Sequence, residues 1–174
     1  MTSCGCPRAT TARGRTATLD AILHASRHDW GVALGLSTTH FAAIRFDAGP
    51  CSPARTRGFL RRTLAGWDLA DYADDATTVT AELVANAIRH ALRRPGRPAP
   101  GREPATAWLA LLCKEHALVC AVADPSPALP AAREADGLAE TGRGLQIVAA
   151  LSEAWGCSPP HATGKTVWAR ITTG

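Results

Sequence analysis

Two stretches in the first half of the chain repeat apolar residues with the period of an α-helix. The first stretch places four apolar side chains on one face: Phe59, Leu60, Leu64 and Trp67. It follows Ser52, a favourable N-cap, and Pro53, which suits the first helical position, so a helix should begin there. The second stretch carries a similar stripe: Ala76, Val79, Leu83 and Ala87. We expect it to run from about Asp74 to Leu92, where a proline-rich segment ends it.

Shorter apolar runs predict strands and one further helix. The strands are expected at four places: residues 41–46, 108–113, 117–123 and 166–171. The second and third of these flank a short polar turn and should form a hairpin. A helix is expected from about Gly144 to Trp155. Residues 124–141 form an irregular segment that is long for a compact domain, and such segments are usually functional.

The chain of 174 residues is long enough for one domain with a core and too short for two. Residues 1–18 are rich in Thr, Arg, Ala and Gly and have little to bury. The apolar content of residues 19–36 is weak and allows a short helix at most. We therefore expect residues 1–38 to be a disordered extension and residues 39–174 to form the domain.

Composition and charge narrow the class of protein. The net charge is +4, but the arginines are scattered, which disfavours a nucleic-acid surface and fits a site for an anionic small molecule equally well. The six cysteines include no Cys-x-x-Cys pair, so a structural zinc site has little support, and Cys113 and Cys120 read as buried hydrophobes. No apolar region typical of a secretory signal precedes Leu19, and no stretch approaches about 18 uninterrupted apolar residues. We expect a cytoplasmic protein without a membrane span.

Candidate chemistry begins on the second predicted helix. Glu82 and Asn86 are four residues apart and share a face, which Arg89 and His90 continue one turn later. Spacing alone favours a solvated helix face. Asparagine, however, is a poor helix former that prefers caps, and here it lies mid-helix beside a glutamate. This arrangement suggests an oxygen ligand for a hard cation.

Three later features add to this candidate site. Asp124 ends a buried strand, where a carboxylate either faces a ligand crevice or starts a turn before proline. The sequence Gly142-Arg143-Gly144 opens a helix, and glycines there let the backbone approach an anion, although a plain turn is common. Residues 164–166 resemble the end of a P-loop, but Pro159 stands where that motif needs glycine and a strand follows, so we reject a P-loop.

Taken in order, these pieces resemble the motifs of the GHKL ATPase superfamily. Residues 82–90 resemble its N box, Asp124 the aspartate of its G1 box, residues 142–148 its G2 box, and residues 164–168 its closing box. Within the superfamily the chain is most similar to the anti-sigma-factor serine/threonine kinase branch, in its actinobacterial single-domain form. The resemblance covers residues 40–173.

The resemblance implies a fold and a set of roles. The fold is an α/β (α+β) two-layer sandwich of the Bergerat type, with helices on one face of a mixed, mainly antiparallel sheet. Asn86 would ligate Mg²⁺, Glu82 would act as base on a serine hydroxyl, and Asp124 would accept the adenine amino group with support from Thr166. Residues 125–141 would form a lid over ATP. The remaining expected ATP contacts are Arg89, His90, Gly142, Arg143, Gly144 and Leu145.

The resemblance also implies partners. The leading hypothesis is a kinase that phosphorylates an anti-sigma-factor antagonist of the STAS type and regulates transcription through a partner switch. A sigma factor and a second copy of the chain are further partners of such proteins, whereas direct binding to nucleic acid or membrane is not expected. One alternative is a binding module in which ATP sets only the lid's shape. Ser126 favours this alternative, because it places a Cβ where the G1 box usually has glycine. A detached histidine-kinase catalytic domain is a weaker alternative.

Overall fold

The structure, a computed structural model, describes residues 40–93, 104–114, 116–129, 143–157 and 164–174. The first half contains β1 (His40–Asp47), α3 (Ser52–Gly66), a 3-10 turn (Ala70–Tyr72), α4 (Ala73–Ala87) and a π-helical turn (Ile88–Leu92). The second half contains β2 (Thr106–Lys114), β3 (Ala117–Asp124), α5 (Gly144–Leu151), β4 (Ala154–Cys157) and β5 (Lys165–Thr172). The expectations for residues 1–38, for most of the lid and for Gly142 fall outside the described residues.

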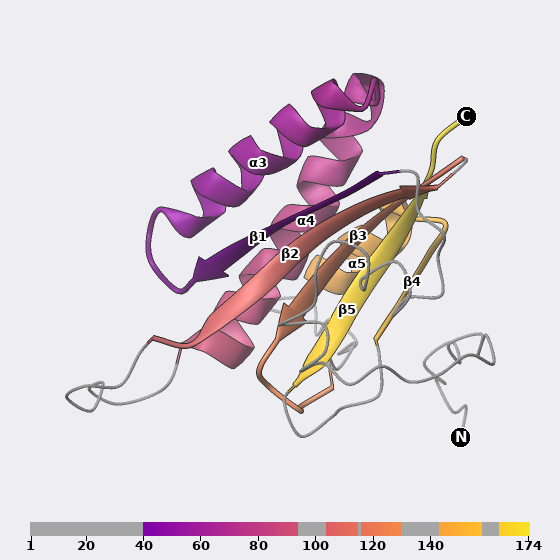
Figure 1. Ribbon diagram of the computed structural model, residues 1–174. Coiled ribbons are helices and arrows are strands. Elements are labelled where there is room, and N and C mark those ends of the chain that lie inside the picture. The colour runs from indigo at the N-terminus through magenta and orange to yellow at the C-terminus, as the bar shows by residue number, and fades with distance from the viewer. Residues whose placement is uncertain (1–39, 94–103, 115, 130–142, 158–163) are drawn as a thin grey trace, which may run out of the picture.

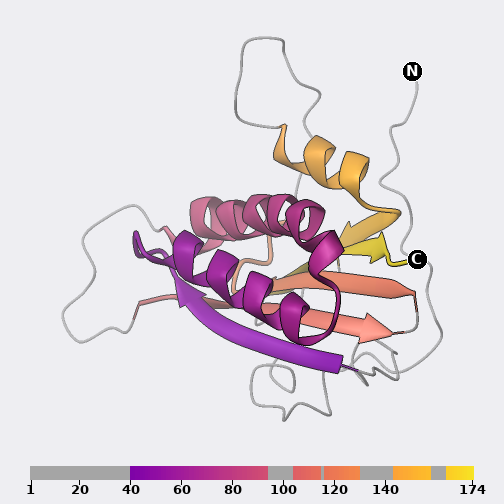
Figure 2. The same ribbon diagram turned by 90° about the horizontal axis from the view of Figure 1, so that it is seen from above.

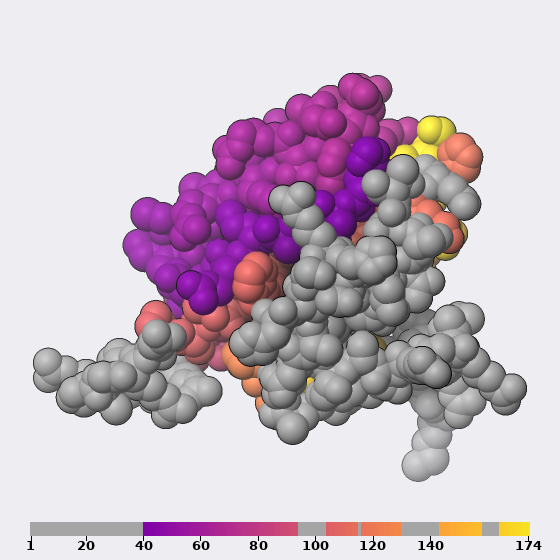
Figure 3. All heavy atoms as spheres, in the orientation of Figure 1, coloured from indigo at the N-terminus to yellow at the C-terminus, as the bar shows by residue number. Residues whose placement is uncertain are grey.

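The strands form one sheet in the order β1-β2-β3-β5-β4, and every described pair is antiparallel. The three helices lie together on one face of this sheet, with α4 between α3 and α5 (Figures 1 and 2). This arrangement confirms the predicted two-layer α+β fold. In the space-filling view α3 runs along one edge of the molecule (Figure 3). It exposes four arginines there: Arg55, Arg57, Arg61 and Arg62.

The core lies between the sheet and the helices. On β3 and β5, alternate residues enter it: Leu118, Cys120, Val122, Val167, Ala169 and Ile171. They pack with helix residues such as Leu60, Val79 and Leu83, which are at most 2% exposed. Because side chains alternate across a strand, the next residues in these two series also face the helices. Those residues are Asp124 and Lys165, which are paired across β3 and β5.

The predicted strands are present, with slightly different ends, and three details of the helices were wrong. Cys51 rather than Ser52 is the N-cap of α3, and the Ser52 hydroxyl instead donates to Asp47 Oδ1 at 2.8 Å. The second predicted helix stops being α-helical at Ala87 and continues as the π-helical turn. Helix α5 ends at Leu151, because the chain then turns back to pair with β5 as the unpredicted strand β4.

No helix within the described ranges is long and apolar enough to cross a membrane.

Candidate functional site

The polar face of α4 meets the first residue of α5. A Cβ placed on Gly144 would lie 2.5 Å from Glu82 Oε2 and 3.8 Å from Asn86 Nδ2. Both α4 side chains are half-buried, and α4 and α5 lie side by side (Figures 1 and 2). The structure thus brings Gly144 next to Glu82 and Asn86, which precede it by about sixty positions in the sequence.

Glycine at position 144 is what allows this close approach. Any side chain there would force the Glu82 carboxylate to move, since real Cβ atoms do not approach an oxygen so closely. The first backbone N–H groups of a helix have no partner within the helix, and they carry the positive end of its dipole. The Glu82 carboxylate therefore lies beside a helix N-terminus, a position that also favours binding of an anion. A carboxylate and a bound anion repel each other unless a cation lies between them or one of them takes up a proton.

The neighbouring candidate residues have no described contact with Glu82. Arg143 is exposed at the N-cap of α5, and its carbonyl accepts from the Ile147 amide at 3.0 Å. Leu145 is 8% exposed and packs inward rather than toward solvent. Arg89 and His90 are both exposed.

The end of α4 is irregular in the same region. The amide of Arg93 donates to the Ile88 carbonyl at 2.9 Å, which is a five-residue step and defines the π-helical turn. Such turns occur often at functional sites. Just before it, the Asn86 Oδ1 accepts from Arg89 Nη1 at 3.4 Å, a long and exposed hydrogen bond. The Asn86 amide is therefore only weakly held by the protein.

A buried ion pair lies at the end of β3. Lys165 Nζ donates to Asp124 Oδ1 at 2.9 Å, and the two side chains are 6% and 3% exposed. The same Oδ1 accepts from the Ser126 amide at 2.8 Å, and Lys165 Nζ also donates to the Ser126 carbonyl at 3.2 Å. The Asp124 carboxylate is thus held by Lys165 and the Ser126 amide, and its expected contact with adenine stays a prediction.

Gly164 fixes the lysine in this position. Its φ of +132° lies in a region that side-chain-bearing residues rarely adopt, and a Cβ there would collide with the Asp124 carbonyl and lie 2.8 Å from Pro125 Cα. The chain therefore enters β5 directly against the end of β3. The signal for Lys165 was present in the sequence, because it continues the apolar alternation of Val167 and Ala169 backward onto the core face.

Thr166 lies elsewhere. It is paired with Ala123, which belongs to a small cluster on the sheet face away from the helices. Since neighbouring residues of a strand point to opposite faces, the register places Lys165, rather than Thr166, beside the Asp124 carboxylate. Thr166 is buried, with 3% of its surface exposed. Its expected support of Asp124 remains a prediction that this register does not favour.

Burial raises the pKa of the Cys120 thiol to about 11 and also raises that of Cys113, so both thiols stay protonated near neutral pH. Both are buried, as the sequence predicted. Within the described part of the chain, no three His, Cys, Asp or Glu side chains form a group that could hold a metal ion by themselves.

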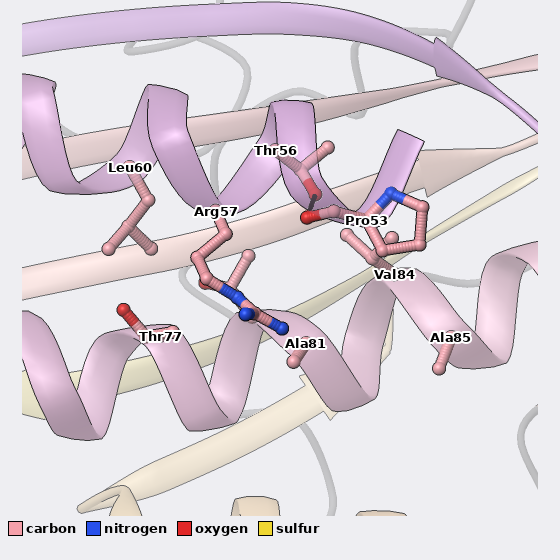
Figure 4. A pocket seen from close by; sticks show the side chains of 9 residues that line it. Pro53, Thr56, Arg57, Leu60, Thr77, Ala81, Val84 and Ala85 are labelled. Carbon is pink, nitrogen blue, oxygen red and sulfur yellow. Dashed lines mark hydrogen bonds between the residues drawn. The ribbon is translucent and has the colours of Figure 1, made fainter. Parts of the chain in front are cut away.

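A separate groove lies between α3 and α4 (Figure 4). Its walls include Leu60 and Val84, and Arg57 of α3 reaches toward Ala81 of α4. An α-helix turns by about 100° per residue, so the α4 residues of the groove face away from Glu82 and Asn86. The groove is therefore distinct from the place where α4 meets α5.

Comparisons with known proteins place these features in context. A family model described as the histidine kinase-like ATPase domain matches residues 46–171, a span that includes Glu82, Asn86, Asp124 and Gly144. Among solved structures, the chain is similar to the crystal structure of the RsbU and RsbW domains of Rv1364c from Mycobacterium tuberculosis, with 19% identity and a TM-score of 0.48. That match covers 76% of this chain and 32% of the other, so the chain spans about a third of that protein's length. No curated protein matches the chain.

Proposed function

Because the chain belongs to the histidine kinase-like ATPase domain family, we propose that it binds ATP with Mg²⁺ and phosphorylates a partner protein on serine or threonine. ATP binding is what this family leads one to expect. The transfer step, the metal and the partner go beyond the family match and rest on the residues of this chain. The observation that carries them is the meeting of Glu82 and Asn86 with Gly144 at the start of α5.

The start of α5 supports binding of the phosphates. Gly144 leaves the backbone open to close approach, and the helix N-terminus supplies N–H donors and a positive dipole end. The exposed Arg143 beside it can add a positive charge. Gly142, Arg89 and His90 are expected to complete the phosphate contacts, and Leu145 to anchor the helix behind them.

The donor set on α4 fits Mg²⁺. This ion prefers oxygen ligands and usually takes only one or two of them from the protein, with the rest from phosphates and water. Asn86 offers an amide oxygen whose described hydrogen bond is long and exposed, so it can reorient toward a cation. Bound there, the ion would neutralise phosphate charge.

Glu82 supports the transfer step. Its carboxylate lies against Gly144, and we expect the γ-phosphate near that residue, so a serine hydroxyl approaching the phosphate passes within reach of Glu82. Glu82 would accept the hydroxyl proton as the oxygen attacks. General-base assistance of this kind contributes about 10²–10⁴-fold to rate.

Asp124 supports recognition of adenine. An ionised carboxylate accepts hydrogen bonds and donates none, so it suits the adenine amino group. The Ser126 amide and the Lys165 ammonium hold the carboxylate in one orientation. The partner we propose is an anti-sigma-factor antagonist of the STAS type, with a sigma factor and a second copy of the chain as further partners in a cytoplasmic partner switch.

The test is phosphate transfer in solution. The full chain is incubated with γ-labelled ATP, Mg²⁺ and candidate antagonist proteins from the same cell, and labelled serine or threonine is identified. The expected result is label on one antagonist, absent when Mg²⁺ is chelated. If ATP binds but no antagonist becomes labelled, the kinase proposal is wrong.

A second function is a binding module that uses ATP only as a structural ligand. It is favoured by Ser126, which carries a side chain at the position where the G1 box usually has glycine. The Ser126 amide donates to Asp124 and its carbonyl accepts from Lys165, so this backbone is held in place. Under this alternative, ATP changes the affinity for a partner and no phosphate moves. Partner affinity is measured with ATP and with a non-hydrolysable analogue. A kinase phosphorylates the partner only with ATP, so the two affinities diverge during incubation, whereas a binding module gives the same affinity with both nucleotides.

A further inference from the structure

We propose that Lys165 determines base specificity, donating a hydrogen bond from its ammonium group to ring nitrogen N1 of adenine while Asp124 accepts from the amino group. This inference rests on the proposed function, since it deepens the same nucleotide site. Sequence motifs give Lys165 no such role, and it follows from the register and contacts of β3 and β5.

The first observation is the burial of the lysine. Lysine is almost never fully buried unless it is paired, and Lys165 is only 4% exposed. Removing an ammonium group from water is costly, and a buried ion pair often does not recover that cost. An apolar residue could continue the core alternation of Val167 and Ala169 more cheaply. A charged donor at this place is therefore best explained by something that it binds.

The second observation is the donor count. An ammonium group has three N–H donors. Two are accounted for by the Asp124 Oδ1 at 2.9 Å and the Ser126 carbonyl at 3.2 Å. We assign the third to the nucleotide base.

The third observation is where the pair points. Asp124 and Lys165 continue the two series of residues that face the helices, and they do so at the end of the sheet where β3 gives way to the irregular segment. They lie on the same side of the sheet as α4, because the other members of both series pack with α4 residues such as Val79. A base that is held by Asp124 is therefore within reach of Lys165.

The chemistry of the pair matches one edge of adenine. Adenine presents an amino donor and, next to it, the acceptor N1. Asp124 only accepts and Lys165 only donates, and their polar atoms lie 2.9 Å apart. A hydroxyl could serve as donor or acceptor, whereas the ammonium fixes the polarity. Guanine reverses both groups, with an acceptor O6 and a donor N1–H, so it meets the pair in the wrong order.

The test changes the ligand before it changes the protein. Binding of ATP, 1-deaza-ATP and 7-deaza-ATP to the full chain is measured by calorimetry. In 1-deaza-ATP a carbon replaces N1, so we expect its affinity to fall about 10- to 100-fold, the usual range for a hydrogen bond to a charged group. The matched control, 7-deaza-ATP, alters a ring nitrogen away from this edge and should bind within about threefold of ATP. GTP should bind more weakly than 1-deaza-ATP.

A variant then ties the effect to the lysine. In Lys165→Met the ratio between ATP and 1-deaza-ATP should fall to about one. Lys114→Met should keep the wild-type ratio, because Lys114 ends β2 and pairs with Ala117, at the opposite end of β3 from Asp124. If Lys165 merely orients Asp124, Lys165→Met should lower the affinities for ATP and for 1-deaza-ATP equally and leave their ratio unchanged. Should Lys165→Met fail to fold, equal affinities of the wild-type chain for ATP and 1-deaza-ATP would still overturn the proposal.

The outcomes separate this inference from the proposed function. Absence of ATP binding overturns the nucleotide site itself. Tight ATP binding with an equal affinity for 1-deaza-ATP overturns only the role of Lys165. An equal loss with 7-deaza-ATP, or a preference for GTP, also overturns it.

Discussion

The two ends of the proposed nucleotide site are built from different materials. The phosphate end joins two helices through half-buried polar side chains, Glu82 and Asn86, whose described contacts are few and loose. The base end joins two strands through a buried ion pair, Asp124 and Lys165, and both side chains also form hydrogen bonds with the Ser126 backbone. Under the proposed function, the groups that exchange partners during the reaction, Glu82 and Asn86, lie at the phosphate end. Groups that must select a ligand sit at the fixed end, where their orientation is set before binding.

The largest expected effect lies at the phosphate end. Glu82→Gln keeps the size of the side chain but removes the base, so phosphate transfer should fall by about 10²–10⁴-fold while ATP affinity stays the same. Transfer is followed with labelled ATP and affinity by calorimetry. The control is Glu153→Gln, which alters an exposed carboxylate paired with Arg170. If the Glu82 variant unfolds, its role is structural and the catalytic assignment fails.

At the base end, the main expected effect of a substitution is a loss of folding stability. Lys165→Met leaves the Asp124 carboxylate buried without its cation, so the free energy of unfolding should fall by about 3–5 kcal/mol. Urea denaturation measures the change. The matched control is Arg61→Met, which breaks an exposed ion pair with Asp74 and should cost about 0–1 kcal/mol. Equal effects at both sites would remove the contrast between a fixed and a loose end.

Gly144→Ala tests how tightly the helix start approaches Glu82. The added methyl group would lie 2.5 Å from Glu82 Oε2, the end of a flexible side chain that can move aside. Folding stability should therefore change by less than about 1 kcal/mol, and the loss should appear in ATP binding and transfer. Affinity and rate are measured alongside thermal stability. Gly66→Ala is the control, because nothing lies within 4 Å of its Cβ position. A Gly144 variant with full activity would show that the two helices can separate freely.

The smallest expected effect belongs to the proposed metal ligand. Asn86→Ala removes one oxygen among several, so ATP affinity should fall about tenfold when Mg²⁺ is present and change little when it is chelated. Calorimetry in both conditions measures the difference. The control is Arg62→Ala, which removes an exposed charge on α3 outside the proposed site and should change affinity by less than about threefold. The same loss with and without Mg²⁺ would argue against metal ligation by Asn86.

The loose end was the easier one to predict from sequence. Glu82 and Asn86 lie four residues apart on one helix, and local periodicity is enough to place them together. The Asp124–Lys165 pair spans 41 residues, and it depends on a strand register that no local pattern specifies. The motif resemblance places Thr166 beside Asp124, and this stays a prediction that the register does not favour, because neighbouring residues of a strand point to opposite faces.

Two elements escaped prediction for related reasons. Strand β4 is only four residues long and is stabilised by pairing with β5, so Trp155 read as the end of a helix. The π-helical turn after Ala87 keeps a helical sequence pattern and differs only in its hydrogen bonds. In both cases the deciding contacts are made with residues outside the local pattern.

Gly164 limits which substitutions this part of the chain can accept. The residue contacts no proposed ligand, yet its positive φ and its approach to the Asp124 carbonyl leave no room for any other side chain. In a library of all single substitutions, this position would tolerate as little change as a catalytic residue, whereas Gly66 would accept many replacements. Intolerance at position 164 would then reflect backbone geometry. A ranking of positions by tolerance would place this structural glycine among the catalytic residues.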